Sequence, residues 1–163
     1  MPDPSSTKLS PLKRGQSAFE RDLDSRLGTY VKLAEQAIIA AKSRALRDFD
    51  LSLAQYAAMM ALYYVPGQSA AQLARTAAVT PQTMSTVLAR LESKRLVERQ
   101  PSAIHSKVLV ITLTAAGEAL VLRADQGARA VEQRIRDAFT DDQANALRDL
   151  LRRVADALKD VQE

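Results

Sequence analysis

Apolar residues recur at helical spacing along most of the chain, which predicts a largely helical protein. The clearest stripe lies in residues 80–99 and consists of Met84, Val87, Leu88 and Leu91. Thr80 and Pro81 precede it, and they suit the N-cap and the first position of a helix. The pattern predicts a helix over residues 80–93 that buries one face and exposes the other.

Other segments repeat this pattern of a capping residue followed by an apolar stripe. Capping boxes beginning at serine or threonine predict helix starts at Ser17, Ser52, Ser69 and Thr140. We expect helices over residues 17–48, 52–64, 69–77 and 114–139, and from 140 onward. Residues 97–99 and the β-branched run 107–113 predict the two strands of a hairpin. Residues 1–16 are rich in Pro, Ser and charge, and we expect a flexible tail.

The order of these elements predicts a winged helix-turn-helix lobe over residues 51–113. The short helix 69–77, a tight turn and the helix at 80–93 form a helix-turn-helix, and the hairpin over residues 97–113 forms the wing. The fold class is therefore mostly α with a small β-hairpin. We expect residues 17–163 to form one domain, in which the long first helix exceeds what the lobe needs and packs partly against a second subunit.

Composition excludes several classes of protein. The sequence has no cysteine, so disulfides and cysteine-ligated zinc are excluded. It has no apolar run of the roughly 18–20 residues that span a bilayer, so no membrane partner is predicted and a cytoplasmic location is expected.

The positive charge is concentrated in residues 69–113. This segment holds six Lys and Arg against two Glu, and the resulting excess equals the net charge of +4 for the whole chain. The outer face of the helix at 80–93 has short polar side chains and no acidic group. Such a helix suits a DNA major groove. An ordinary amphipathic surface helix with clustered surface charge is the alternative interpretation.

Candidate DNA-binding residues follow from side-chain chemistry. Gln82 can form hydrogen bonds to adenine. Thr86 can contact either base edges or a thymine methyl, and Arg90 can bind either guanine or a phosphate. Ser69 and Thr80 either hold phosphates or act only as helix caps. The predicted DNA-binding set comprises Ser69, Arg75, Thr80, Gln82, Thr83, Ser85, Thr86, Arg90, Lys94, Arg99, His105 and Lys107.

Catalysis is not predicted. His105 is the only histidine. The sequence shows no nucleophile paired with an evident base, and no cluster of metal ligands at a useful spacing. We expect neither an enzyme nor a cofactor or metal site.

Three segments carry a resemblance to a known family: SLAQYAAMMAL at 52–62, SAAQLARTAAVTPQTMSTVLARLESKRLVER at 69–99 and ITLTAAGEAL at 111–120. With its long flanking helices, the sequence resembles the multiple-antibiotic-resistance regulator (MarR) family of bacterial winged-helix transcription factors. The resemblance implies a homodimer formed through residues 17–48 and 114–163. It also implies a palindromic operator on double-stranded DNA, read by the helix at 80–93 in the major groove and by the wing in the minor groove.

The wing tip departs from the family pattern. Family wings commonly carry an Asp-x-Arg cluster, whereas His105-Ser106-Lys107 stands here. Lysine lacks the planar fork of arginine, so we expect a weaker wing contact.

The resemblance also implies a small aromatic or phenolic effector that releases a repressor from DNA. Candidate ligand-binding residues are Tyr30, Tyr56, Met59, Met60 and Tyr63. Their helical spacing is equally typical of core residues. Lys32 or Arg44 is a candidate partner for a ligand carboxylate. Two alternatives remain open: a winged-helix module that binds an acidic protein, and a constitutive regulator without an effector.

Overall fold

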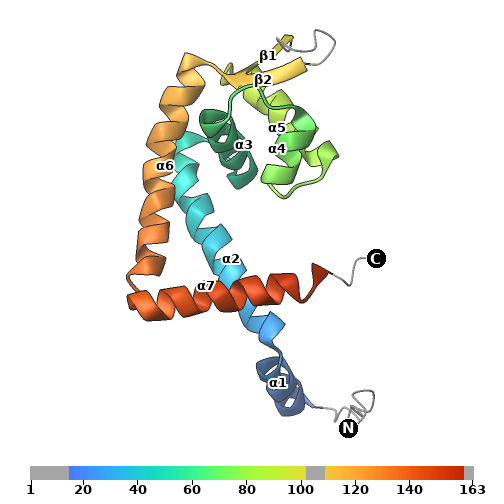
Figure 1. Cartoon of the computed structure of the whole chain (residues 1–163), viewed down its shortest axis with the longest axis vertical. Coiled ribbons are helices and arrows are strands. Elements are labelled where there is room, and N and C mark those ends of the chain that lie inside the picture. The colour runs from blue at the N-terminus through green and yellow to red at the C-terminus, as the bar shows by residue number, and fades with distance from the viewer. Residues whose placement is uncertain (1–14, 102–108, 160–163) are drawn as a thin grey trace. The chain divides into compact units, whose positions relative to one another are not determined.

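A computed structural model describes residues 15–101 and 109–159, which belong to two compact units, residues 1–38 and 39–163. The elements (Figure 1) are α1 (Gln16–Ser25), α2 (Leu27–Leu46), the 3₁₀ turn η1 (Arg47–Phe49), α3 (Leu53–Tyr64), α4 (Ala70–Thr76), α5 (Pro81–Ser93), β1 (Val97–Pro101), β2 (Leu109–Leu113), α6 (Ala115–Arg136) and α7 (Asp141–Asp156). Within the described stretches, no helix combines the length and the apolar character needed to cross a membrane.

The first helix is divided in two, which corrects the single helix predicted over residues 17–48. Arg26 separates α1 from α2 and adopts an extended conformation, with φ −94° and ψ 111°. Gly28 and Thr29 follow, and both residue types have low helix propensity. The apolar spacing that suggested one helix continues across the break, so periodicity alone could not reveal it.

Side-chain caps begin five of the helices as predicted. In each, the hydroxyl of the N-cap residue accepts a hydrogen bond from the backbone N–H three residues on; the cap residues are Ser52, Ser69, Thr80, Thr114 and Thr140. The predicted cap at Ser17 is wrong. Gly15 occupies the N-cap position of α1, and no side chain caps that helix.

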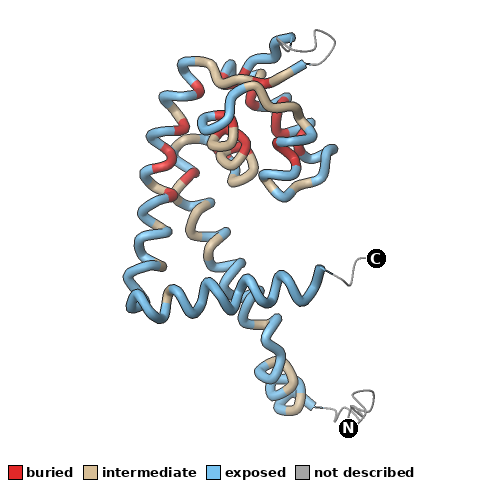
Figure 2. The backbone as a smooth tube through the Cα atoms, viewed as in Figure 1, coloured by how far each residue is buried: buried red, intermediate tan, exposed pale blue. Residues whose placement is uncertain are grey.

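The core of the second unit is built around α3, α4 and α5, with α6 packed against α3. Figure 2 shows the buried residues gathered on these helices, and on α6 they lie between Gly117 and Ala128. The largest fully buried side chains are Leu46, Met59, Leu62, Leu73, Met84, Leu88, Leu91 and Val121. All four apolar residues predicted to form the stripe of α5 are buried. That helix is therefore held in place by its apolar face.

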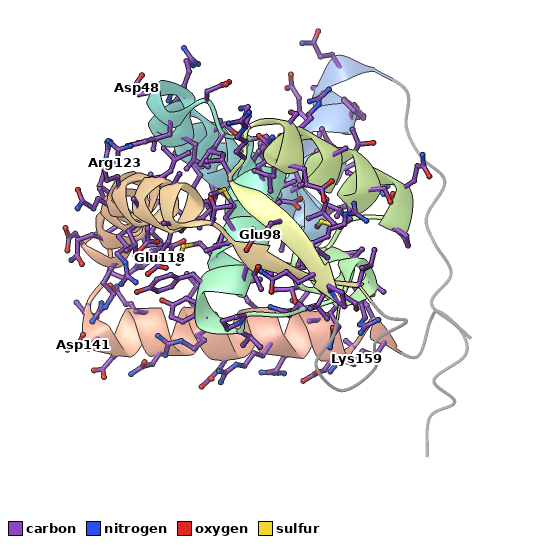
Figure 3. The ribbon with its side chains drawn as sticks, turned by 90° about the horizontal axis from the view of Figure 1, so that it is seen from above. Asp48, Glu98, Glu118, Arg123, Asp141 and Lys159 are labelled. Atoms are coloured by element: carbon purple, nitrogen blue, oxygen red, sulfur yellow. The ribbon has the colours of Figure 1, made fainter. Side chains whose placement is uncertain are left out.

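A two-stranded antiparallel hairpin follows α5. β1 and β2 pair from Val97 opposite Leu113 to Pro101 opposite Leu109. Val97 and Ile111 are buried against the lobe, whereas the rest of β1 is exposed, including Glu98 (Figure 3). This confirms the predicted wing at its base. The loop between the strands, residues 102–108, lies outside the described residues.

Gln68 ties the base of the wing to α3. Its backbone carbonyl accepts a hydrogen bond from the N–H of Ile111 at 2.9 Å. Its side-chain Nε2 donates to the carbonyls of Ala61 at 2.8 Å and Val65 at 2.9 Å, at the C-terminal end of α3. One side chain thus donates to two carbonyls at the end of α3, of which that of Ala61 also accepts the backbone N–H of Val65 at 2.9 Å.

The junction between β2 and α6 approaches the end of α5 closely. The backbone N–H of Thr114 donates to the carbonyl of Leu96 at 3.1 Å, and the Thr114 hydroxyl donates to the carbonyl of Arg95 at 2.7 Å. A Cβ atom added to Gly117 would lie 2.0 Å from the Leu96 carbonyl oxygen. Only glycine fits at this position without displacing the backbone.

Gly117→Ala is therefore expected to destabilise the fold. The clash involves backbone rather than a flexible side chain, so we expect a loss of about 3 kcal/mol or more in the free energy of unfolding. Gly28→Ala is the matched control, because a Cβ there meets nothing within 4 Å. That change should be neutral or stabilise α2 by up to about 1 kcal/mol. Equal urea midpoints for the two variants would contradict the close approach at Leu96.

Candidate nucleic-acid interface

The predicted reading helix α5 presents a polar face to solvent. Thr80 caps it by accepting a hydrogen bond from the N–H of Thr83 at 3.1 Å, and Pro81 occupies its first turn. The buried stripe fixes the rotation of the helix about its axis, so Gln82, Thr83, Ser85, Thr86 and Arg90 are all exposed. The face contains no acidic residue from Pro81 through Leu91. It is compatible with close approach to a polyanion.

Two hydroxyl groups on this face are already engaged as donors. The Ser85 hydroxyl donates to the carbonyl of Pro81 at 3.0 Å, and the Thr86 hydroxyl donates to that of Gln82 at 3.3 Å. Their oxygen lone pairs remain available, so both residues can accept hydrogen bonds from base amino groups. Gln82 makes no side-chain hydrogen bond to another described residue, and its amide is free to act as donor and acceptor.

The predicted basic residues differ in whether a carboxylate already pairs with them. Lys94 donates to the carboxylate of Asp50 at 2.7 Å and to its carbonyl at 2.6 Å, and Arg99 donates to Glu92 at 2.5 Å. Arg75 and Arg90 have no ion-pair partner within residues 15–101 and 109–159. The second pair of cations is therefore more available to a phosphate than the first.

The remaining predicted positions are caps or lie in the wing tip. Ser69 forms a capping box with Gln72 at the start of α4, and its hydroxyl also donates to the Gln72 side chain at 2.9 Å. His105 and Lys107 lie outside the described residues, so the predicted contact of the wing tip with the minor groove stays a prediction.

A separate hollow of about 610 Å³ lies between α2, α3 and α6. Its walls are formed by Lys42, Tyr56, Asp125, Ala128, Arg129, Glu132, Gln133 and Arg136. The hydroxyl of Tyr56 donates to one oxygen of Asp125 at 2.7 Å, and Nε of Arg129 donates to the other at 2.5 Å. Lys42 forms an ion pair with Glu132. The floor of the hollow is thus a charged network that links α3 to α6.

This network shifts the pKa values of both acidic groups in it. Burial alone would raise the pKa of Asp125, but hydrogen bonds from Arg129 and Tyr56, together with the arginine charge, lower it below its ordinary value. Burial and the bond to the Asp125 carboxylate raise the pKa of Tyr56 well above its usual range. Near neutral pH, Asp125 is therefore ionised and Tyr56 is neutral.

The structure brings only one predicted ligand-binding residue to this hollow. Tyr56 lines it, whereas Met59 is fully buried and Met60 packs against the core. Tyr63 is partly exposed and stacks edge-on with its neighbour Tyr64, and Tyr30 belongs to the first unit. Met59 and Met60 are therefore core residues, which was the alternative interpretation of their helical spacing.

Sequence reasoning missed Asp125 and Arg129. A usable signal was present, because Asp125 falls beside Ala124 on the apolar stripe of α6 and has a basic residue four positions later. A carboxylate on a buried stripe requires a partner. The pairing with Tyr56 joins residues 69 positions apart and had no local signal.

Known proteins share the sequence pattern and the fold of this chain. A profile described as the MarR family matches residues 49–106. The HTH-type transcriptional repressor Rv2887 of Mycobacterium tuberculosis is 38% identical over 112 residues, which are 69% of this chain and 81% of that protein. A crystal structure of Rv2887 with DNA superposes with a TM-score of 0.64 at 34% identity, covering 80% of this chain and 98% of the other. A crystal structure of Rv2887 with salicylic acid superposes with a TM-score of 0.64 at 35% identity, covering 80% of this chain and 97% of the other. The predicted fold class is confirmed.

Tyr56→Phe tests the charged network. Removing a hydroxyl that donates to a carboxylate should lower the free energy of unfolding at pH 7 by about 1–3 kcal/mol. The lowered pKa of Asp125 means that its ionised form stabilises the fold above the unfolded value of about 3.9, and that this contribution is lost as the pH falls through the folded value. The difference from wild type should therefore shrink in urea titrations below about pH 4.

Tyr63→Phe is the control for this measurement, because the Tyr63 hydroxyl makes no hydrogen bond to a described residue. It should change stability by less than about 0.5 kcal/mol at either pH. A Tyr56→Phe effect that is no larger, or that is the same at acid and neutral pH, would rule out the proposed role of the Asp125 carboxylate.

Proposed function

The chain belongs to the MarR family of transcriptional regulators, and we propose that it is a dimeric repressor released from its operator by a small aromatic acid. The observation that carries the proposal is the acid-free polar face of α5, which the buried stripe holds toward solvent. The crystal structure of Rv2887 with DNA supports this interpretation of the interface. We place α5 in the major groove of double-stranded DNA.

The proposed reading set is built around the first two turns of α5. Gln82 and Thr86 address base edges, with Thr83 and Ser85 beside them. Arg75 and the N-terminus of α4 at Ser69 contact the sugar-phosphate backbone, which fixes the position of the helix without reading sequence.

Dimerisation is supported by the unpartnered apolar side of α7. This helix has no buried residue in the chain described, yet one side is apolar and exposed. Its exposed apolar residues are Leu147, Leu150, Leu151 and Val154, and Leu158 follows at the end of the helix. We assign this surface, with other exposed apolar residues of segments 114–163 and 17–48, to the contact with a second copy. Two-fold symmetry then matches a palindromic operator, with half-sites about one helical turn of DNA apart.

The hollow at Asp125 is the proposed effector site. Its volume lies in the range of small-molecule sites, and its walls combine the phenol of Tyr56 with three cationic side chains, against two carboxylates that are already paired with Arg129 and Lys42. The crystal structure of Rv2887 with salicylic acid supports an aromatic acid as the ligand class. A ligand carboxylate would compete with Asp125 for Arg129. Arg129 also donates to the Tyr64 hydroxyl of α3 at 3.4 Å, so a ligand that takes up its guanidinium would loosen this contact between α6 and α3 and so alter the separation of the two reading helices.

Operator binding tests the reading face. Wild-type protein should bind a palindromic duplex from the region upstream of its own gene, with affinity that falls as salt rises. Gln82→Ala should reduce discrimination at one base pair per half-site by about 1–3 kcal/mol, measured by fluorescence anisotropy with matched and mismatched duplexes. Gln126→Ala makes the same change on the exposed side of α6 and should bind as wild type does. Weak binding to every duplex would instead favour a protein-interaction module.

Salicylic acid tests the effector site. At about 100 times its dissociation constant it should stabilise the wild-type fold by about 2.7 kcal/mol and weaken operator binding. Arg129→Gln should bind the operator but lose most of the response to the ligand. Arg123→Gln, an exposed position on the same helix (Figure 3), is the control. A response retained in Arg129→Gln would place the ligand elsewhere, and no response in wild type would favour a constitutive regulator.

A further inference from the structure

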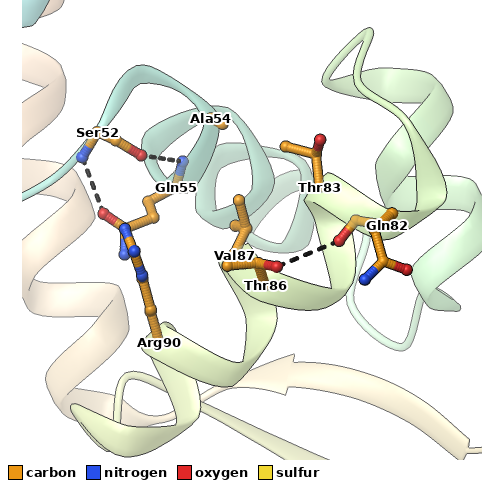
Figure 4. A pocket seen from close by; sticks show the side chains of 8 residues that line it. All are labelled: Ser52, Ala54, Gln55, Gln82, Thr83, Thr86, Val87 and Arg90. Carbon is orange, nitrogen blue, oxygen red and sulfur yellow. Dashed lines mark hydrogen bonds between the residues drawn. The ribbon is translucent and has the colours of Figure 1, made fainter.

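Two adjoining hollows lie between the start of α3 and the flank of α5. Their volumes are about 350 and 490 Å³, and Ser52, Gln55 and Arg90 line both. Figure 4 shows the side chains of Gln55 and Arg90 reaching into the space between the two helices. This concave surface is separate from the hollow at Asp125 and shares no lining residue with it.

The larger of the two hollows has an excess of positive charge. Arg47, Arg90 and Lys94 line it, and the single acidic residue in its wall is Asp50, which is bound by Lys94. Arg47 and Arg90 have no ion-pair partner in the part of the chain that the structure describes. Two guanidinium groups from different elements, η1 and α5, therefore line one cavity, and neither is paired with a carboxylate of the described residues. Planar guanidinium groups match the geometry of a phosphate.

The side-chain amide of Gln55 adds a hydrogen-bond donor to these cations. The residue is only 5% exposed, and its side-chain Oε1 accepts the backbone N–H of Ser52 at 2.9 Å. That bond fixes the orientation of the amide, because Oε1 must face the backbone donor. The Nε2 group consequently has no acceptor among the described residues, although its side chain lines both hollows. Among the described residues, Thr112 Oγ1 is the side-chain polar atom that is both buried and without a partner, so the Nε2 group of Gln55 still reaches the hollows and can donate to a ligand oxygen there.

The spacing along α5 relates this cavity to the reading face. Gln82 and Arg90 are eight positions apart, which is about 12 Å along a helix. The major groove of B-DNA is also about 12 Å wide. With the first turn of α5 against base edges, Arg90 reaches the wall of the groove, where the phosphates lie. Arg47 and Gln55 line the same hollow as Arg90, so a phosphate held in that hollow would face all three side chains.

We propose that Arg47, Gln55 and Arg90 bind one backbone phosphate of the operator in each half-site, and we call these three residues the phosphate site. This inference rests on the proposed function as a DNA-binding regulator. It assigns Arg90 to a phosphate rather than to guanine. It also gives a DNA contact to Gln55 and Arg47, on segments outside the helix-turn-helix.

Gln55→Glu tests the phosphate site without removing the helix cap. Glutamate keeps the oxygen that accepts the Ser52 N–H, since Ser-x-x-Glu is itself a capping box, but it replaces the free donor with a negative oxygen. We expect affinity for duplex DNA of any sequence to fall about tenfold or more, the slope of log affinity against log salt to fall by about one, and sequence preference to be retained. Gln143→Glu makes the same change in the capping box of α7 and serves as the matched control.

Arg47→Gln keeps the test valid if Gln55→Glu unfolds the protein. Arg47 is exposed on η1, so its loss should not affect folding, and Arg44→Gln on α2 is its control. Arg47→Gln should weaken binding to all duplexes by a similar or smaller factor. A scan of duplexes carrying one neutral methylphosphonate should then find a position at which wild type loses affinity and the variant does not.

The outcomes separate this inference from the proposed function. If wild type binds no duplex specifically, both fail. If it binds its operator but the phosphate-site variants match their controls, or change base preference, only the phosphate site is overturned. A measurement with inorganic phosphate distinguishes a DNA phosphate from a free anion. If it raises the melting temperature of wild type but not of Gln55→Glu, while both bind DNA equally, the cavity binds a free anion and the assignment to DNA is wrong.

Discussion

Burial of the apolar stripe of α5 is the constraint on which the rest of this structure depends. Met84, Leu88 and Leu91 are completely buried in the core, where α3, α4 and β1 pack against α5. Their burial decides which side of α5 faces solvent, because a helix that commits one stripe to the core has no freedom of rotation. The polar face from Gln82 to Arg90 is exposed as a result. The proposed reading surface is thus a product of core packing rather than of any interaction among the reading residues themselves.

The end of α5 is also where the wing and α6 are anchored. The carbonyl of Leu96 accepts the backbone N–H of Thr114, and Gly117 allows the first turn of α6 to approach that carbonyl. Asp125 lies farther along the same α6 helix and is bound to α3 through Tyr56. A change at Asp125 therefore acts on a helix whose first turn packs against Leu96, just after α5. This arrangement provides a continuous physical route from the proposed effector site to DNA, without requiring a separate hinge.

Local signals in the sequence were sufficient for most of the fold. Caps at Ser52, Thr80 and Thr140 predicted helix starts because their hydrogen bonds span only three residues, and the stripe of α5 predicted its own burial. The break at Arg26 was missed because apolar spacing continues across it. The network at Asp125 and the free amide of Gln55 were missed for a different reason. The network joins residues 69 positions apart, and the hollows lined by Gln55 form only where α3 packs against α5, so local spacing in the sequence could not reveal either.

Counting charges in the sequence located the positive excess at residues 69–113 but could not show how many of those cations are already paired with carboxylates. Lys94 and Arg99 are paired with Asp50 and Glu92 in the isolated chain. A phosphate that recruits either side chain must compete with an existing carboxylate, so the net gain is smaller than for an unpaired cation. Arg90 carries no such competitor among the described residues. We therefore expect the electrostatic attraction to DNA to come less from the most basic stretch, residues 94–99, than from the hollows between α3 and α5.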